Sequence, residues 1–229
     1  MTTLYGPLHP GPLTRRDPLW KSLSPKEREQ ERLRRLFFHE EPLWAEGFER
    51  IAGVDEAGVG ALAGPVVAAA VILPRGASIP GLNDSKRLTP ARRAALFPKI
   101  RKAALAVATG RTSPPEVDKL NVYRAALLAM RRAVERLPLR PQFVLVDARR
   151  IPDINVPQRP VVKGDALSHT IAAASIVAKV TRDRLMARYV KKYPSYGFSA
   201  HKGYGTAAHK AAIRRHGILR IHRKSFNLE

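Results

Sequence analysis

The chain has 229 residues, of which 41 are Lys or Arg, 19 are Asp or Glu and none is Cys, giving a formal net charge of +22. The absence of cysteine excludes disulfides and thiolate metal sites, and the charge predicts a polyanionic partner, either nucleic acid or an anionic membrane surface. The sequence has no run of about 18 uncharged apolar residues and no signal-peptide pattern, so we expect a cytoplasmic protein that does not enter a membrane.

The basic residues gather toward the C-terminus. Residues 1–50 carry 9 Lys or Arg and 8 Asp or Glu, whereas residues 171–229 carry 13 and 2. Within residues 188–205 the cations alternate with aromatic residues, a pattern typical of a groove that binds nucleic acid. A solvated helix face would explain a charge run alone equally well.

In chain order, the sequence predicts a tail followed by alternating strands and helices. Residues 1–24 are interpreted as a flexible N-terminal tail, and residues 25–229 as one domain with a basic helical C-terminal region. The predicted elements are a polar helix at 25–39, a strand ending near Val54, a strand at 65–73, a helix starting at Pro90 and disturbed at Pro98, a strand at 105–112, a Ser113–Glu116 capping box before a helix at 120–137, a strand at 142–147, and helices at 166–192 and 206–216. This alternation predicts an α/β fold.

Four carboxylates fall at the ends of the predicted elements. Asp55 and Glu56 follow a strand and precede a Gly-rich turn, Asp147 ends another strand, and Asp165 precedes the long helix. Active-site residues of open α/β sheets gather at such ends. Because successive side chains on a strand face opposite ways, Asp55 and Glu56 are expected to share one site only if the strand ends there.

Each acid also has a purely structural interpretation. Asp165 could cap the following helix, Asp147 could start a turn, and Asp55 could bind the amides of its own turn, but these interpretations leave Glu56 without a role. Together, the acids in a basic protein predict a site for Mg²⁺ or Mn²⁺. Two such ions can activate a water and stabilise the leaving oxygen in phosphodiester cleavage, while Lys and Arg bind the phosphate backbone.

The chain resembles the bacterial ribonuclease HII family over residues 47–226. The resemblance rests on the order and spacing of "GVDEAGVGALAGPVVAAAVIL", "LNDSKRL", "LVDA", "VKGD", "IAAASIVAKVTRD" and "HKGYGT". It implies a ribonuclease H-like fold, a central mixed β-sheet flanked by α-helices with a helical C-terminal extension. It also implies an endonuclease that cleaves RNA in RNA·DNA hybrids and at single ribonucleotides in DNA duplexes, leaving 3′-hydroxyl and 5′-phosphate ends. We expect it to act on these duplexes as a monomer.

The resemblance also implies roles for individual residues. The family's metal-binding acids, which hold Mg²⁺ or Mn²⁺ as two ions in the substrate complex, match Asp55, Glu56, Asp147 and Asp165. Its substrate-reading tyrosine matches Tyr204, which would stack on the deoxyribose beside the ribonucleotide; the alternative is a half-buried tyrosine with a satisfied hydroxyl. Lys86 in "NDSK" is either a phosphate contact or a solvated loop lysine.

The chain departs from the family pattern at two places. Gly58, Val59 and Gly60 stand where the family usually has Gly-Arg-Gly, a turn that approaches the ribonucleotide 2′-hydroxyl through backbone groups. Valine offers no guanidinium and resists a positive φ, so we expect impaired junction selectivity or turnover. The alternative function is therefore a catalytically impaired nucleic-acid-binding protein on the same fold. Ala148 follows Asp147 where Gly is common.

Other residues that invite a chemical role are assigned supporting ones. Ser175 lacks the Gly-x-Ser-x-Gly turn of a serine nucleophile. Asp84 is expected to contact the metal-binding acids without binding the metal itself. Without cysteine or a His-Glu-x-x-His pattern, five histidines are expected to be structural or to contact phosphate rather than to bind zinc: His169, His201, His209, His216 and His222.

Overall fold

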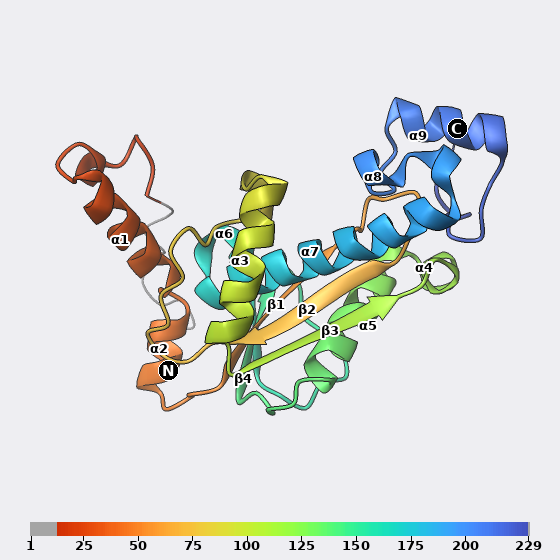
Figure 1. The fold of residues 1–229 in the computed structure, drawn as a ribbon. Coiled ribbons are helices and arrows are strands. Elements are labelled where there is room, and N and C mark those ends of the chain that lie inside the picture. Colours follow the sequence, from red (N-terminus) through yellow and green to blue (C-terminus); the bar gives the residue numbers. More distant parts are fainter. Residues whose placement is uncertain (1–12, 229) are drawn as a thin grey trace.

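The computed structural model describes residues 13–228 and has a five-stranded sheet between layers of helices (Figure 1). The strand order is β3-β2-β1-β4-β5. The strands β1 (Ile51–Ala57), β2 (Val66–Ile72) and β3 (Ala106–Thr112) pair antiparallel. By contrast, β4 (Phe143–Asp147) pairs parallel with β1, and β5 (Gln158–Val161) pairs parallel with β4. This mixed sheet confirms the predicted α/β fold.

Helices cover both faces of the sheet. α5 (Val122–Glu135) packs on one face, and α7 (His169–Lys192) packs on the other with α3 (Pro90–Ala103) beside it. The shorter elements are η1 (Pro18–Trp20), α1 (Pro25–Leu36), α2 (Glu40–Ala45), η2 (Ser85–Arg87), α4 (Pro114–Leu120), α6 (Gly164–Leu167), η3 (Pro194–Tyr196), α8 (Phe198–His201) and α9 (Ala207–His216). No helix within residues 13–228 combines the length and apolar character that a membrane crossing requires.

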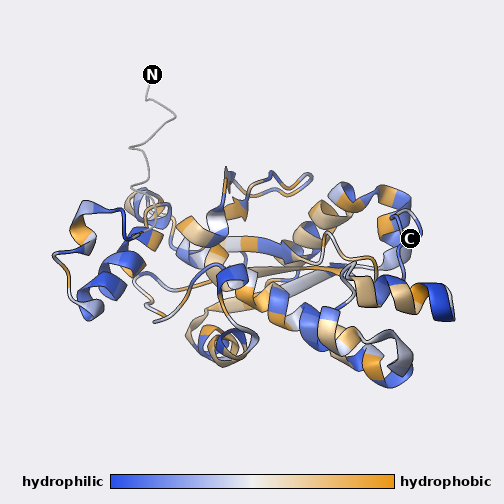
Figure 2. Ribbon diagram, turned by 90° about the horizontal axis from the view of Figure 1, so that it is seen from above, coloured by the Kyte–Doolittle hydropathy of each residue, from blue (hydrophilic) through white to orange (hydrophobic). Residues whose placement is uncertain are grey.

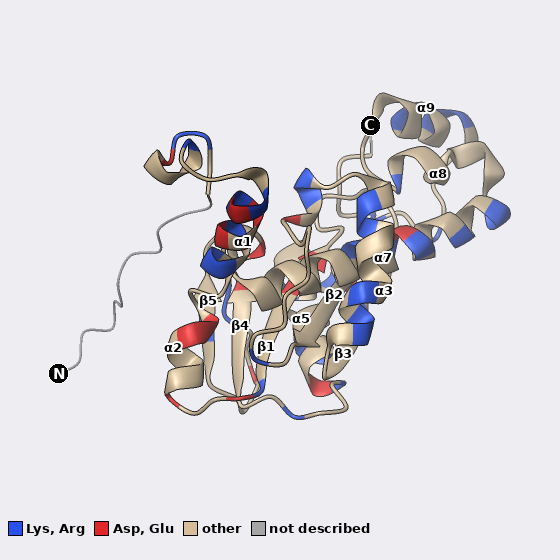
Figure 3. Cartoon of the chain, turned by 60° about the vertical axis from the view of Figure 1, so that its left-hand side comes forward, with Lys and Arg blue, Asp and Glu red and all other residues tan. Residues whose placement is uncertain are grey.

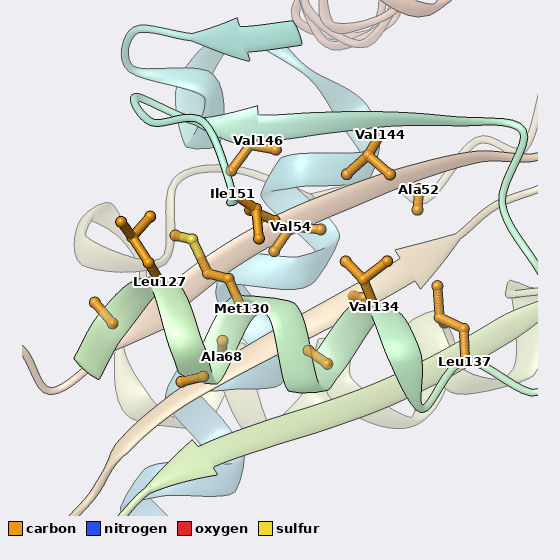
Figure 4. Packing of buried hydrophobic residues seen from close by; sticks show 14 of the residues in the cluster. Ala52, Val54, Ala68, Leu127, Met130, Val134, Leu137, Val144, Val146 and Ile151 are labelled. Atoms are coloured by element: carbon orange, nitrogen blue, oxygen red, sulfur yellow. The ribbon is translucent and has the colours of Figure 1, made fainter. Parts of the chain in front are cut away.

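β2 is buried on both faces because it lies between these two helix layers. Ala68 belongs to the cluster formed with Met130 and Val134 of α5 (Figure 4), whereas Ala69 and Val71 belong to the cluster formed with α3 and α7. The small side chains of β2 let both helices approach the sheet closely. Figure 2 shows hydrophobic and hydrophilic residues alternating around the outer helices, the pattern of helices with one face against a core.

The capping signals in the sequence are confirmed. Thr89 accepts a hydrogen bond from Arg92 N and Pro90 opens α3. Ser113 and Glu116 form the predicted capping box at the start of α4. The helix α3 continues through Pro98, which lies on its exposed side, so the proline does not end it.

Two predicted boundaries are wrong. β1 does not end near Val54 but continues to Ala57, because Glu56 and Ala57 still pair with β2. The long helix does not run unbroken from residue 166, because Ser168 takes an extended conformation and caps α7 through a hydrogen bond from Ile171 N. The sequence pattern also missed α2 and β5, a short edge strand that contains a proline.

The N-terminal part of the described chain is bonded to α1 and to the start of α7. Residues 1–12 of the predicted tail lie outside the described residues, whereas in residues 13–24 Leu13 is buried and Asp17 pairs with Arg35. The buried carboxylate of Glu40 accepts hydrogen bonds at the start of α7, from Ser168 Oγ at 2.6 Å and from Thr170 N at 3.0 Å. Burial raises the pKa of Glu40, whereas these hydrogen bonds at the first turn of α7 lower it, and they link α2 to α7.

Candidate metal centre and active site

Three aspartates gather at one edge of the sheet. Asp55 lies in β1 and Asp147 ends β4, and these strands are parallel neighbours, so their carboxyl ends meet. Asp165 comes from α6, which follows β5. One carboxylate oxygen from each aspartate lies within 4.8 Å of the others. This spacing lets one divalent cation contact all three carboxylates.

The negative charges of this group repel one another. Burial raises the pKa of Asp55 well above its usual range, and the carboxylates of Glu56 and Asp147 raise it further. Burial also raises the pKa of Asp147, with a second contribution from Asp165. The Gly164 N–H donates to Asp147 Oδ1 at 2.7 Å and partly opposes that rise. A bound cation would supply the charge that keeps these carboxylates ionised.

Glu56 does not belong to this group of three. Since β1 continues through both acids, Asp55 and Glu56 are successive strand residues whose side chains face opposite ways. Burial raises the pKa of Glu56, the charge of Arg149 lowers it, and Asp147 raises it. The Glu56 carboxylate is therefore close enough to interact electrostatically with Asp147, and its role as a fourth ligand stays a prediction.

Lys86 reaches the aspartates from η2. Its Nζ lies 2.9 Å from Asp165 Oδ2, and its backbone N–H donates to Asp84 Oδ1 at 2.8 Å. Burial alone would lower the pKa of Lys86, but the hydrogen bond and charge of Asp165 raise it. The side chain is 77% exposed, so the ammonium group can leave Asp165 at little cost. The hydrogen bond from the Lys86 backbone makes Asp84 the N-cap of η2, and its support of the metal-binding acids stays a prediction.

Two fully buried arginines hold the Gly-rich turn beside the acids. Arg223 donates to the carbonyl oxygens of Gly58 and Val59, each at 2.7 Å. Arg182 donates to the carbonyl oxygens of Ala63 and Pro65, among others. Buried guanidinium groups bonded to carbonyls in this way fix the backbone of the turn, because leaving any of these donors unpaired is costly.

The turn does not require a positive φ at Val59. Gly58 has φ +92°, whereas Val59 is not among the described non-Gly residues with positive φ. A Cβ at position 58 would lie 1.9 Å from Arg182 Nε, so glycine is required there by both conformation and space. Val59 is partly buried against the hydrophobic cluster that includes α5, and its φ is not positive.

Tyr204 lies beside the segment that follows the Gly-rich turn. Its backbone bridges to Ala61, and its half-buried ring has two cations over it, Lys179 Nζ at 5.5 Å and Arg182 Cζ at 5.1 Å from the ring centroid. The basic residues cluster along α3, the end of α7 and α9 (Figure 3). The stacking role of Tyr204 stays a prediction.

Sequence reasoning missed Arg182 and Arg223, which were counted only as part of the basic surface. For Arg182 a signal existed, since it lies seven residues after Ser175 on a helix whose first half is almost wholly buried. The hydroxyl oxygens of Ser175 and Ser85 lie 2.8 Å apart, and Ser175 lies close enough to Asp55 to oppose the rise of that pKa. Ser175 therefore supports the site instead of attacking a substrate.

Ala148 takes the left-handed conformation, with φ +58°. We expect Ala148→Gly to raise the free energy of unfolding by about 0.5–1 kcal/mol, because relief of the left-handed penalty outweighs the entropy that glycine adds to the unfolded chain. Thermal unfolding measures the change. The matched control is Ala211→Gly on the exposed face of α9, which should lower stability by about 1 kcal/mol. A loss of stability in both variants would contradict the strain at position 148.

Comparison with known proteins agrees with the motifs. A sequence model of the family described as Ribonuclease HII matches residues 52–229. The chain is 54% identical over 198 residues to Ribonuclease HII of Desulfitobacterium hafniense (strain DSM 10664 / DCB-2), covering 86% of this chain and 76% of that protein. It is 55% identical over 204 residues to Ribonuclease HII of Geobacillus thermodenitrificans (strain NG80-2), covering 88% and 78%.

Solved structures show the same fold. Ribonuclease H2 from Pyrococcus horikoshii OT3 aligns with a TM-score of 0.67 and 27% identity, covering 78% of this chain and 94% of that one. The ribonuclease HII in a complex with PCNA from Archaeoglobus fulgidus aligns with a TM-score of 0.65 and 26% identity, covering 79% and 96%. The predicted ribonuclease H-like fold is thus confirmed, and the chain belongs to the ribonuclease HII family of endonucleases that degrade RNA in RNA·DNA hybrids.

Proposed function

We propose that this protein is a metal-dependent endonuclease that cleaves RNA in RNA·DNA hybrids and at single ribonucleotides within DNA duplexes, leaving 3′-hydroxyl and 5′-phosphate ends. The observation that carries the proposal is the convergence of Asp55, Asp147 and Asp165, whose oxygens lie within 4.8 Å of one another in a strongly basic chain. A cluster of carboxylates alone repels the phosphates of a nucleic acid. It can take part in phosphodiester cleavage when divalent cations bridge the carboxylates to the substrate.

The residues present fit Mg²⁺ or Mn²⁺. The donors are hard carboxylate oxygens, and their mutual repulsion favours a cation between them. A ribonuclease HIII structure, of 19% identity and the same fold, is a complex with Mn²⁺. We assign the ion-holding role to Asp55, Glu56, Asp147 and Asp165, with two ions in the substrate complex. When bound, such ions activate water and stabilise the leaving oxygen at a phosphodiester.

The chain's own cations and aromatic residues bind and orient the duplex. Lys86, exposed beside Asp165, is placed to exchange its carboxylate partner for a phosphate when a divalent cation takes over Asp165. Tyr204 stacks on the sugar next to the ribonucleotide. The turn at Gly58, Val59 and Gly60 presents its backbone to the 2′-hydroxyl, held from behind by Arg223. Because its φ is not positive, Val59 fits this turn, and what the substitution removes is the guanidinium of the usual arginine and its phosphate contact.

The test is cleavage of a labelled DNA duplex that contains one ribonucleotide, alongside a continuous RNA·DNA hybrid and an all-DNA duplex, with Mg²⁺, Mn²⁺ or chelator. We expect metal-dependent nicking of both ribonucleotide substrates on the 5′ side of a ribonucleotide, and no cut in all-DNA duplex. If only the hybrid is cut and Val59→Arg restores nicking at the lone ribonucleotide, the missing guanidinium limits junction recognition. Tight binding without cleavage under any metal would instead establish the catalytically impaired binding protein.

A further inference from the structure

Three histidines surround the backbone of Tyr204 in the C-terminal cluster around Phe198. His209 and His222 are buried and face each other, with their Nε2 atoms 3.1 Å apart. His201 stacks on His209 with ring centroids 4.3 Å apart. These residues come from α9, from the C-terminal segment and from the end of α8, so the contacts join three parts of the chain.

The hydrogen bonds determine which nitrogen carries each proton. The backbone N–H of Leu219 donates to His222 Nδ1 at 2.8 Å, so Nδ1 is an acceptor and the proton of neutral His222 sits on Nε2. That proton points at His209 Nε2, which must accept it. The proton of His209 is then on Nδ1, which lies 3.0 Å from the carbonyl oxygen of Tyr204 and donates to it. The chain of donors runs in one direction and ends on Tyr204.

The other side of the same peptide segment is held by the Gly-rich loop. The carbonyl oxygen of Gly203 accepts from Leu62 N at 2.8 Å and from Ala63 N at 3.2 Å. The Gly203–Tyr204 segment therefore lies between residues Leu62 and Ala63, which follow β1, and the pair His209 and His222. With the ring only half-buried, these backbone contacts determine where the ring is presented.

We propose that His209 and His222 are positioning residues for substrate recognition: as a neutral, directed pair they hold the Tyr204 backbone so that its ring meets the sugar beside the ribonucleotide. This role rests on the proposed function, since it acts through Tyr204. The pair does not touch the aspartates or the reacting phosphate. Its loss should therefore weaken recognition of the ribonucleotide junction far more than it slows the chemical step.

The surroundings keep the pair neutral. Burial, together with a smaller effect of the nearby His209, lowers the pKa of His222 to about 4. Burial also lowers the pKa of His209, with His201 acting in the same direction. The titratable groups that face the pair from neighbouring elements are His201, whose ring stacks on His209, and Tyr196, whose ring centroid lies 5.6 Å from that of His222. A proton added to either histidine would set two N–H groups face to face and break the chain.

Two substitutions at one position separate the positioning role from general packing. In His209→Gln the amide can replace Nε2 and still meet His222, but it loses the donor to Tyr204. In His209→Asn the amide replaces Nδ1 and keeps that donor. We expect His209→Gln to raise KM for the single-ribonucleotide duplex about tenfold, the equivalent of one hydrogen bond, with kcat within about twofold of wild type. His209→Asn should restore KM to within about threefold of wild type.

Ala211→Gln, which places the same new side chain on the exposed face of α9, is the control and should leave both constants unchanged. Nitrogen-15 NMR of the full chain at pH 7 tests the pair independently of any substrate: we expect His222 protonated on Nε2 only and His209 on Nδ1 only. Opposite tautomers, a fall in kcat alone, or equal losses in the Gln and Asn variants would each overturn the proposal. If the NMR result holds but the wild type cuts no ribonucleotide substrate, the proposed function fails, and the positioning role fails with it.

Discussion

Asp147→Asn is expected to lower kcat by about a thousandfold while leaving the fold intact, since losing about 4 kcal/mol of metal-assisted stabilisation has that effect on a rate. Asparagine keeps an Oδ1 that accepts the 2.7 Å hydrogen bond from Gly164 N, so the turn into α6 should hold. What disappears is one negative charge from the group of three. The measurement is single-turnover cleavage of the hybrid with Mn²⁺, together with duplex binding.

Stability separates this interpretation from a structural aspartate. Because the folded protein raises the pKa of Asp147 above its unfolded value, the ionised carboxylate costs stability at neutral pH when metal is absent. We therefore expect metal-free Asp147→Asn to be more stable by about 1 kcal/mol, or about 2–4 °C in Tm, and to gain less from added Mn²⁺. Asp153→Asn, exposed and paired only with Arg131 among the ion pairs of the described residues, is the control that should change neither activity nor stability. A strongly destabilised Asp147→Asn would contradict the account.

Gly53→Ala is expected to destabilise the protein by about 3 kcal/mol, at the upper end of the usual cost of overpacking a core. A Cβ at position 53 would lie 2.1 Å from the backbone carbon of Thr170 and 2.3 Å from Ile171 N. No side-chain rotation can relieve this clash, so α7 must move away from β1. The expected fall in Tm is about 6–12 °C for a domain of this size.

Activity should fall with it, because α7 follows α6 and Asp165 directly. A displacement of about 1 Å at Asp165 is enough to reduce the rate about a hundredfold. Gly60→Ala is the stability control, since a Cβ there meets no described atom within 4 Å and the φ is not positive. Differential scanning calorimetry of both variants decides the matter: equal melting temperatures would show that α7 does not pack on β1 as closely as the structure has it.

The sequence predicted the three aspartates because a local rule places them. Asp147 ends an apolar run, and Asp165 opens a helix, so both fall at element ends where sheet edges collect functional groups. The same rule also selected Asp55, but Asp55 is not at a strand end, since β1 continues past it to Ala57. The pairing of Glu56 with Ala68 of β2 depends on a partner strand that the local pattern does not contain.

The buried arginines and histidines were beyond local patterns for a different reason. Arg223 lies in the C-terminal segment after α9, outside any helix, and only the tertiary fold brings it to the carbonyls of Gly58 and Val59. Charge counting places such a residue on the surface, which is the usual location. Glu40 was missed likewise, because its hydrogen-bond partners at the start of α7 lie more than a hundred residues away.

The most direct test of the account is the position of the metal. A crystal of the full chain soaked in Mn²⁺ would show an anomalous scattering peak, and we predict that the peak lies between the carboxylates of Asp55, Asp147 and Asp165, with the Lys86 ammonium displaced from Asp165. A peak elsewhere, or no peak at a concentration of Mn²⁺ that supports cleavage, would contradict the claim that these three aspartates form the catalytic metal centre.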